Sequence, residues 1–228
     1  MMANIGQAAV LVVLAAVAII LHELAHGYAA LALGDETALR QGRLSLNPLR
    51  HVDPVGTLLL PGFLLVSQLA TIGRVAFMFG WAKPVPVDMR RFRKPRQMMA
   101  LVALAGPAMN LALAFLAAHI LRIDGLRQDV VDTVLGFIAI NLLLGLFNLL
   151  PLPPLDGGRI MVGILPLPLA RVWARIEPFG IPVVMGLLLL PTLLRQAGIA
   201  ADPLGHVLYP AMNWILPHLL SLAGVRDA

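Results

Sequence analysis

The sequence predicts an all-α polytopic membrane protein with about five to six membrane segments. Hydrophobic residues make up 59% of its 228 residues and charged residues 13%, and the mean hydropathy is +0.86. This composition excludes an ordinary soluble domain. The basic residues gather in short connections between long apolar runs. We therefore interpret the basic residues behind the net charge of +5 as topology signals that face anionic lipid of the bilayer. We expect no nucleic acid partner.

The first apolar run, Ile5 to Leu33, contains the pattern H-E-x-x-H at residues 22–26. As one helix it would be more than about 40 Å long, so its C-terminal end must leave a hydrocarbon core of about 30 Å. On a helix, His22 and His26 lie on one face and can bind one metal ion, with Glu23 beside them as a general base. Ionisable groups in hydrocarbon are costly and usually functional. The alternative is a helix end whose polar side chains are solvated at the interface.

The next region is less regular. Gly42 to Pro48 alternates apolar and polar residues, which favours a short strand or an extended segment. The apolar run from Val55 to Trp81 is interrupted by Pro61-Gly62 and by Gly73-Arg74. These interruptions weaken a reading as one clean span, and a broken or re-entrant hairpin is equally plausible. A self-consistent topology requires the region to return to the side it left, which favours the hairpin.

A positive cluster follows, which the positive-inside rule places in the cytoplasm. Its members are Lys83, Arg90, Arg91, Arg93, Lys94 and Arg96. Two further spans are expected, Met98 to Ile120 and Val130 to Leu150, and the second returns the chain to the cytoplasmic side. If the first helix runs from outside to inside, the histidine pair and Asp156 emerge near the same face.

The remainder of the chain holds two shorter apolar runs with prolines, Ile181 to Leu194 and Leu204 to Leu222, and neither looks catalytic. Every connection is short, so we expect one membrane domain over residues 1–228. Met1 to Asn4 lacks the basic start of a signal peptide, and we expect the first helix to be retained.

Asp156 is the best candidate for a third metal ligand. The sequence contains no cysteine, so a metal must be held by histidines and carboxylates. Asp156 lies among prolines and apolar residues and precedes Gly157-Gly158, which allow a close approach of backbone. The alternative is an ordinary Asp-Gly turn at a helix end.

Together, H-E-L-A-H in the first helix and L-D-G-G about 130 residues later resemble the site-2 proteases, the intramembrane zinc metalloproteases. The resemblance extends from about Leu21 to Gly158. It includes the motifs Gly106-Pro107-x-x-Asn110, Asn148-x-x-Pro151 and Gly80-Trp81-Ala82-Lys83-Pro84-Val85-Pro86. The chain is similar to the small bacterial members without a PDZ domain.

The resemblance implies a three-helix catalytic core over about residues 5–160, with C-terminal membrane segments over about 178–222. It implies that His22, His26 and Asp156 bind one Zn²⁺ and that Glu23 is catalytic. The expected reaction is hydrolysis of peptide bonds within transmembrane segments of membrane-anchored proteins, as in regulated intramembrane proteolysis. The expected location is the bacterial inner membrane, with the active site toward the cytoplasm.

A helical substrate must unwind before it is cut, and polar side chains must then bind its backbone. Asn148 and, less strongly, Asn110 are the candidates for that role or for binding the oxyanion; the alternative for both is hydrogen bonding between helices. Water also needs a polar channel, whose mouth His51 could line together with Asp53 and Arg159.

A different class of function uses the same ligands. A divalent-cation transporter or metal-handling membrane protein could hold an ion at His22, His26 and Asp156 in transit. Glu23 argues against that reading, because transit requires ligands but no base beside them. A non-catalytic scaffold that binds membrane partners is a third reading, which the complete set of ligands and base disfavours.

Overall fold

The computed structural model describes residues 5–73, 80–196 and 202–225. Within these ranges the chain forms helices joined by irregular connections and contains no strand, which confirms the all-α prediction. The long helices are α1 (Ile5–Ala32), α3 (Leu60–Ile72), α4 (Pro95–Ala118), α5 (Gln128–Leu149), α8 (Gly180–Gln196) and α9 (Pro203–Leu222). The short helices are α2 (Thr37–Arg40), α6 (Asp156–Ile164) and α7 (Leu167–Ala174).

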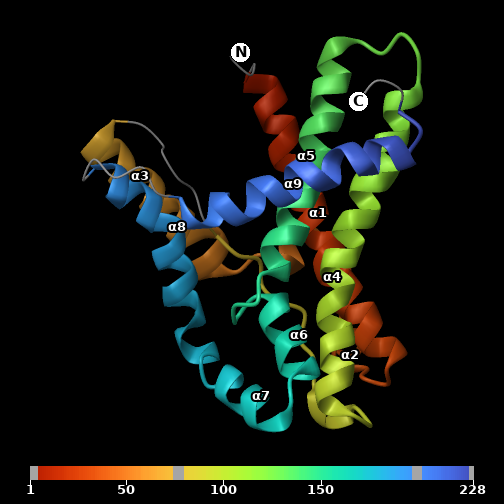
Figure 1. The fold of residues 1–228 in the computed structure, drawn as a ribbon, viewed down its shortest axis with the longest axis vertical. Helices are drawn as coiled ribbons and strands as arrows, with labels where there is room; N and C mark the ends of the chain where they lie inside the picture. The colour runs from red at the N-terminus through yellow and green to blue at the C-terminus, as the bar shows by residue number, and fades with distance from the viewer. Residues whose placement is uncertain (1–4, 74–79, 197–201, 226–228) are drawn as a thin grey trace.

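Five helical stretches among the described residues are long and apolar enough to cross a membrane, so the chain is a multi-pass membrane protein. They are Ala9–Ala32, Pro54–Thr71, Pro95–Arg122, Gln128–Leu149 and Leu167–Pro191. The predicted segment from Leu204 to Leu222 forms α9, which is not among these five. Figure 1 shows α9 crossing the bundle, whereas α1, α4 and α5 run along its length.

The three-helix core consists of α1, α4 and α5, which pack on one another, and α4 also packs along α6. Where α4 meets α5, Ala114 and Ala118 are fully buried against Ile138 and Leu142. Small residues at such a contact let the two backbones approach closely, which stabilises helix pairs in a membrane. Leu220 of α9 joins the same cluster. The C-terminal end of α9 thus packs against α4 and α5.

The region after residue 53 differs in part from the prediction. A π-helical turn, Pro54–Leu59, continues directly into α3, so Pro61-Gly62 does not break the helix. Pro61 stands in the first turn of α3, where proline is tolerated. The helix ends at Gly73, whose φ of 67° is left-handed; residues 74–79, including the predicted interruption at Arg74, lie outside the described residues.

The two ends of the region from Val55 to Trp81 lie side by side. The backbone N–H of Trp81 donates to the carbonyl of Gly56 at 3.1 Å, and the Thr57 hydroxyl donates to the carbonyl of Trp81 at 2.9 Å. The chain therefore leaves and re-enters the core at one place. That the region returns to the membrane side it left stays a prediction.

The segment from Gly42 to Pro48 contains no strand. It leaves α2 through a turn in which Gly42 has a φ of 61°, a conformation that favours glycine. It then continues into the short 3₁₀ helix Pro48–His51, whose first turn is capped by the Asn47 side chain. The alternation of polar and apolar residues therefore marks an irregular connection.

The basic connection before α4 and the short helices α2 and α7 lie at one end of the molecule (Figure 1). The connection between α4 and α5 lies at the other end. In the basic connection, a hydrogen bond from the Arg90 guanidinium holds the pKa of the partly exposed Asp88 carboxyl below its usual value. The positive cluster predicted from the sequence thus lies at one end of the bundle, opposite the connection between α4 and α5.

Candidate metal centre

Two histidines of α1 and the first residue of α6 converge on one point. The Nε2 atoms of His22 and His26 are 3.0 Å apart. Each lies 3.2 Å from Oδ2 of Asp156. All three side chains are buried, and their spacing is that of a group able to hold a metal ion.

The contacts of the other ring nitrogen, Nδ1, show where each histidine carries its proton. Nδ1 of His22 lies 2.6 Å from Oδ1 of Asn110, and Nδ1 of His26 lies 2.7 Å from the carbonyl of Val102. Because both partners are carbonyl oxygens that only accept, each Nδ1 carries the proton and donates it. Both Nε2 lone pairs therefore point toward Asp156.

The donor set fits a small divalent cation. The three converging atoms are all acceptors, and Oδ2 of the buried Asp156 has no hydrogen-bond donor among the described residues. Such a cluster is unfavourable unless a cation neutralises it. Tetrahedral zinc with nitrogen and oxygen ligands at about 2.0–2.1 Å separates its ligand atoms by about 3.3 Å. The observed separations of 3.0 to 3.2 Å are close to that value.

Glycines make the close approach of α6 possible. A Cβ atom on Gly157 would lie 2.2 Å from the carbonyl of Leu150, and one on Gly158 would lie 2.5 Å from the nitrogen of Pro153. The far end of α6 is held by Arg96 of α4, whose guanidinium donates to the carbonyl of Val162 at 2.9 Å. The helix that begins with Asp156 is therefore fixed at both ends.

Gly106 of α4 provides the space for both imidazoles. A Cβ atom there would lie 2.5 Å from Nε2 of His26 and 2.6 Å from Cε1 of His22. Pro107 follows and is fully buried. One turn further, Asn110 accepts the His22 hydrogen bond. The Gly-Pro-x-x-Asn motif therefore supplies room for the histidines and orients one of them.

Glu23 lies beside the group of His22, His26 and Asp156 at a cavity of about 310 Å³. Its Oε2 atom accepts a hydrogen bond of 2.8 Å from the backbone N–H of Val85. The cavity wall also includes Trp81, Asn148 and Arg159. A carboxylate beside the ligand group and open to a cavity is placed to exchange a proton with a substrate.

The structure brings together His22, Glu23, His26 and Asp156, and it places the three other predicted residues differently. Asn148 lines the cavity and donates to the carbonyl of Leu144 in its own helix. Asn110 is fully buried, and its Nδ2 atom donates to Oδ1 of Asn141 at 3.0 Å. Both of its polar atoms therefore bind protein groups.

His51 is only 3% exposed and is not among the described residues that line this cavity. Its Nε2 atom donates to the carbonyl of Ser45 at 2.7 Å. Arg159, which was grouped with it at the expected channel mouth, does line the cavity. The structure thus places His51 within the packed connection between α2 and α3.

Sequence reasoning missed several residues around the site. Asn141 continues the hydrogen-bond chain from Asn110 to the carbonyl of Phe137; an asparagine inside an apolar span was a signal that could have revealed it. Ile181 and Val184 bring α8 to the cavity wall. The sequence holds no comparable signal for them, because they are ordinary apolar residues of a helix.

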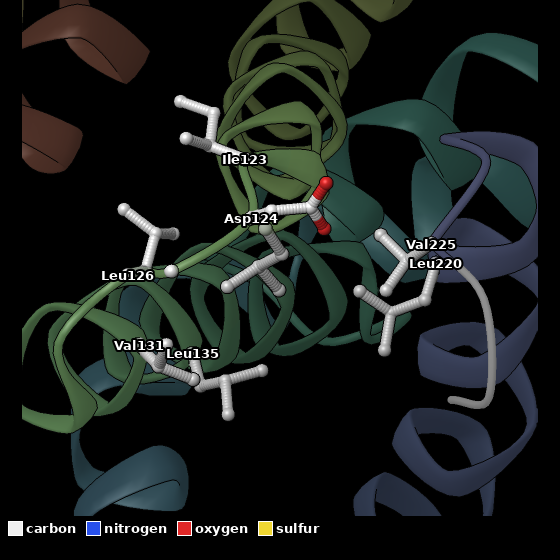
Figure 2. A pocket seen from close by; sticks show the side chains of 9 residues that line it. Ile123, Asp124, Leu126, Val131, Leu135, Leu220 and Val225 are labelled. Atoms are coloured by element: carbon white, nitrogen blue, oxygen red, sulfur yellow. The ribbon is translucent and has the colours of Figure 1, made fainter.

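A second cavity, of about 510 Å³, lies where the connection between α4 and α5 meets the end of α9. Figure 2 shows Asp124 there, together with Leu220 and Val225. Asp124 is the only ionisable side chain among its described lining residues. Its described lining therefore lacks the groups that hydrolysis requires.

Comparison with known proteins assigns the family. The model of Peptidase family M50 matches residues 119–190, which include Asp156. The chain is 39% identical over 215 residues to "Putative zinc metalloprotease YwhC" of Bacillus subtilis, covering 89% of this chain and 85% of that protein. The chain belongs to peptidase family M50. This is the family of the site-2 proteases, as the sequence motifs predicted.

Two further relatives are named "Putative zinc metalloprotease Rip2". The protein from Mycobacterium tuberculosis is 33% identical over 183 residues, covering 78% of this chain and 65% of its own length. The protein from Mycolicibacterium smegmatis is 31% identical over 179 residues, covering 77% and 64%. The chain thus spans slightly less than two thirds of these relatives. No solved structure matches it significantly.

Proposed function

We propose that this chain is an intramembrane zinc endopeptidase that hydrolyses peptide bonds within transmembrane segments of membrane-anchored proteins. The observation that carries the proposal is the convergence of His22, His26 and Asp156 beside Glu23 at an open cavity. Both histidines belong to the stretch Ala9–Ala32, which is apolar enough to span a membrane. Membership of a peptidase family and relatives named as zinc metalloproteases support it.

The chemistry divides between the metal and Glu23. One zinc ion bound by His22, His26 and Asp156 would act as a Lewis acid, polarising the scissile carbonyl and making water acidic enough to deprotonate near neutral pH. Glu23 takes the proton from the attacking water and passes it to the leaving amine. The N–H of Val85 holds one oxygen of that carboxylate, and the other oxygen is left for proton transfer.

The substrate must present an extended backbone, because a helix encloses its amides in its own hydrogen bonds. Asn148 lies at the cavity wall and is proposed to bind the unwound backbone or the developing oxyanion. For Asn110 we propose a different role from the one predicted. Since both of its polar atoms are engaged, it orients His22.

We further propose that the chain forms one catalytic membrane domain of the bacterial inner membrane, with the site open toward the cytoplasm. The positive cluster supports this orientation. It precedes α4 at the end of the bundle opposite the connection between α4 and α5 (Figure 1). A transmembrane-helix protein is the proposed partner, within the lipid bilayer.

The deciding experiment measures cleavage of a panel of single-span membrane substrates in liposomes by purified protein. Wild type is compared with Glu23→Gln, Asp156→Asn, the matched surface variant Glu177→Gln, and wild type with a zinc chelator. We expect cleavage by wild type and Glu177→Gln only, with zinc retained in Glu23→Gln and lost in Asp156→Asn. Wild-type rates in Glu23→Gln would refute the mechanism. Zinc crossing the liposomes without any cleavage would replace it with the carrier reading.

A further inference from the structure

The backbone of residues 83–88, here called the 83–88 segment, is held at three points. The N–H of Lys83 donates to the carbonyl of His51 at 2.8 Å. The N–H of Val85 donates to Oε2 of Glu23 at 2.8 Å. The N–H of Asp88 donates to Oδ2 of Asp35 at 2.7 Å. The segment thus joins α1 at Glu23 and, through Asp35, just beyond the end of that helix.

Val85 is the only possible backbone donor in the middle of the 83–88 segment. Its neighbours Pro84 and Pro86 have no N–H group. Its side chain is buried and faces Gly27 of α1, on which a Cβ atom would lie 2.9 Å from Cγ1 of Val85. The position of this one N–H relative to Glu23 therefore depends on how the surrounding backbone is held.

Arg43 holds that backbone. Its Nη2 atom donates to the carbonyl of Lys83 at 2.8 Å and to the carbonyl of Pro84 at 3.3 Å, the two residues that precede Val85. Both carbonyls belong to peptide units within one residue of the N–H that contacts Glu23. Arg43 therefore acts at the point where a small displacement would move the Val85 amide.

The environment of Arg43 is costly. The residue is only 9% exposed, and its Nε atom has no hydrogen-bond partner within the described part of the chain. No carboxylate among the described residues forms an ion pair with it. A buried cation bound only by neutral carbonyls loses hydration that these bonds replace incompletely. Packing alone could be provided by an uncharged side chain of similar length, so the guanidinium indicates a more specific role.

We propose that Arg43 is a positioning residue for the catalytic carboxylate. It fixes the carbonyls of Lys83 and Pro84, this places the N–H of Val85 on Oε2 of Glu23, and the carboxylate is thereby oriented for proton transfer. The inference rests on the proposed function of Glu23. It assigns a role to a residue far from the H-E-x-x-H motif in the chain.

The first test separates catalysis from binding in liposomes. Arg43→Met removes the donors, and because misplacement of a catalytic group by about 1 Å costs about 100-fold, we expect kcat to fall by about that factor. KM and bound zinc per chain should stay at wild-type values. Arg43→Lys keeps one cationic donor and should recover part of kcat. Arg40→Met, which removes an exposed guanidinium paired with Glu36, is the matched control and should behave as wild type.

The second test addresses the amide itself. Val85→Pro removes the N–H while keeping an apolar side chain, and Val85→Ala keeps the N–H while removing most of that side chain. If the hydrogen bond matters, Val85→Pro lowers kcat about as much as Arg43→Met, and Val85→Ala lowers it much less. Equal losses in the two Val85 variants would show that packing, and not the donor, is what counts, and would overturn the proposal.

A third measurement does not depend on activity. The 83–88 segment carries only four backbone amides, because two of its six residues are proline. We expect hydrogen exchange of the Lys83 and Val85 amides to be faster in Arg43→Met than in wild type or Arg40→Met. Unchanged exchange overturns the proposal even if activity falls. If wild type cleaves no substrate, the proposed function fails, and the exchange result alone decides whether Arg43 holds Val85 on Glu23.

Discussion

The Nδ1 atom of His22 lies 2.6 Å from Oδ1 of Asn110. This contact determines which ring nitrogen of His22 is available to a metal. Asn110 is held in turn by Asn141, which donates to the carbonyl of Phe137. The chain of amides runs from α1 through α4 to α5. The three helices of the core therefore jointly orient His22, the proposed metal ligand, as outer partners of ligating histidines generally do.

Replacing Asn110 should weaken metal binding. Asn110→Leu removes the acceptor that fixes the proton on Nδ1, so we expect zinc affinity to fall by about 10- to 100-fold, measured by competition with a chelator. Asn110→Asp keeps an acceptor and should lose less. Asn213→Leu, on the exposed surface of α9, is the matched control. If Asn110→Leu bound zinc as wild type does and only cleavage were impaired, the residue would belong to substrate binding after all.

Gly106→Ala should disrupt the centre by steric conflict alone. The added methyl group would lie 2.5 Å from Nε2 of His26, well inside van der Waals contact, so one or both imidazoles must rotate away. We expect bound zinc per chain and cleavage to fall together, while the helical circular dichroism stays unchanged. Gly186→Ala in α8 meets no atom within 4 Å and serves as the control. Full zinc occupancy in Gly106→Ala would contradict the geometry of the centre.

Much of the fold and site could be predicted because the decisive signals are local. H-E-x-x-H places two candidate ligands and a candidate base on one helix turn, so helical periodicity alone puts them together. Asp156 could be proposed because ionisable residues among apolar ones are rare. The apolar runs predicted the long helices, whereas the three-helix core was implied by the resemblance to the site-2 proteases.

The remaining features depend on contacts between distant segments. Arg43 meets the carbonyls of Lys83 and Pro84 some 40 residues away, and no local pattern specifies such a pairing. The expected break at Pro61-Gly62 was wrong because the preceding π-helical turn carries the helix past them. Two apolar side chains of α8 line the same cavity as Glu23 of α1, a meeting of segments distant in the sequence that composition does not reveal.

Asp35 should matter for stability more than for chemistry. It is fully buried, and its carboxylate accepts from the N–H of Thr37 at 3.0 Å, from the hydroxyl of Thr37, and from the N–H of Asp88. In Asp35→Asn, one oxygen becomes a donor that faces another donor. We expect a loss of about 1–3 kcal/mol in the free energy of unfolding, measured by denaturant titration in detergent. Asp129→Asn, at an exposed ion pair with Arg127, should change it by less than about 1 kcal/mol.

Metal removal should destabilise the folded protein through the same three ligands. Without a cation, two Nε2 lone pairs and a carboxylate oxygen lie within 3.2 Å of one another in a buried site, and this arrangement is unfavourable. A ligand that binds only the folded state at 100 times its dissociation constant stabilises it by about 2.7 kcal/mol. For a domain of this size, that corresponds to about 5 to 10 °C in melting temperature.

We therefore expect a chelator to lower the melting temperature of wild type by that amount and to leave Asp156→Ala unchanged, because this variant has already lost its metal. Restoring zinc should recover the wild-type value and have no effect on the variant. Glu23→Gln separates the ligands from the base: Glu23 lies beside the group but is not one of its members, so this variant should respond to the chelator as wild type does. A chelator effect of equal size in Asp156→Ala would place the metal elsewhere. No effect in wild type would mean that the three side chains hold a proton, and not a cation, between them.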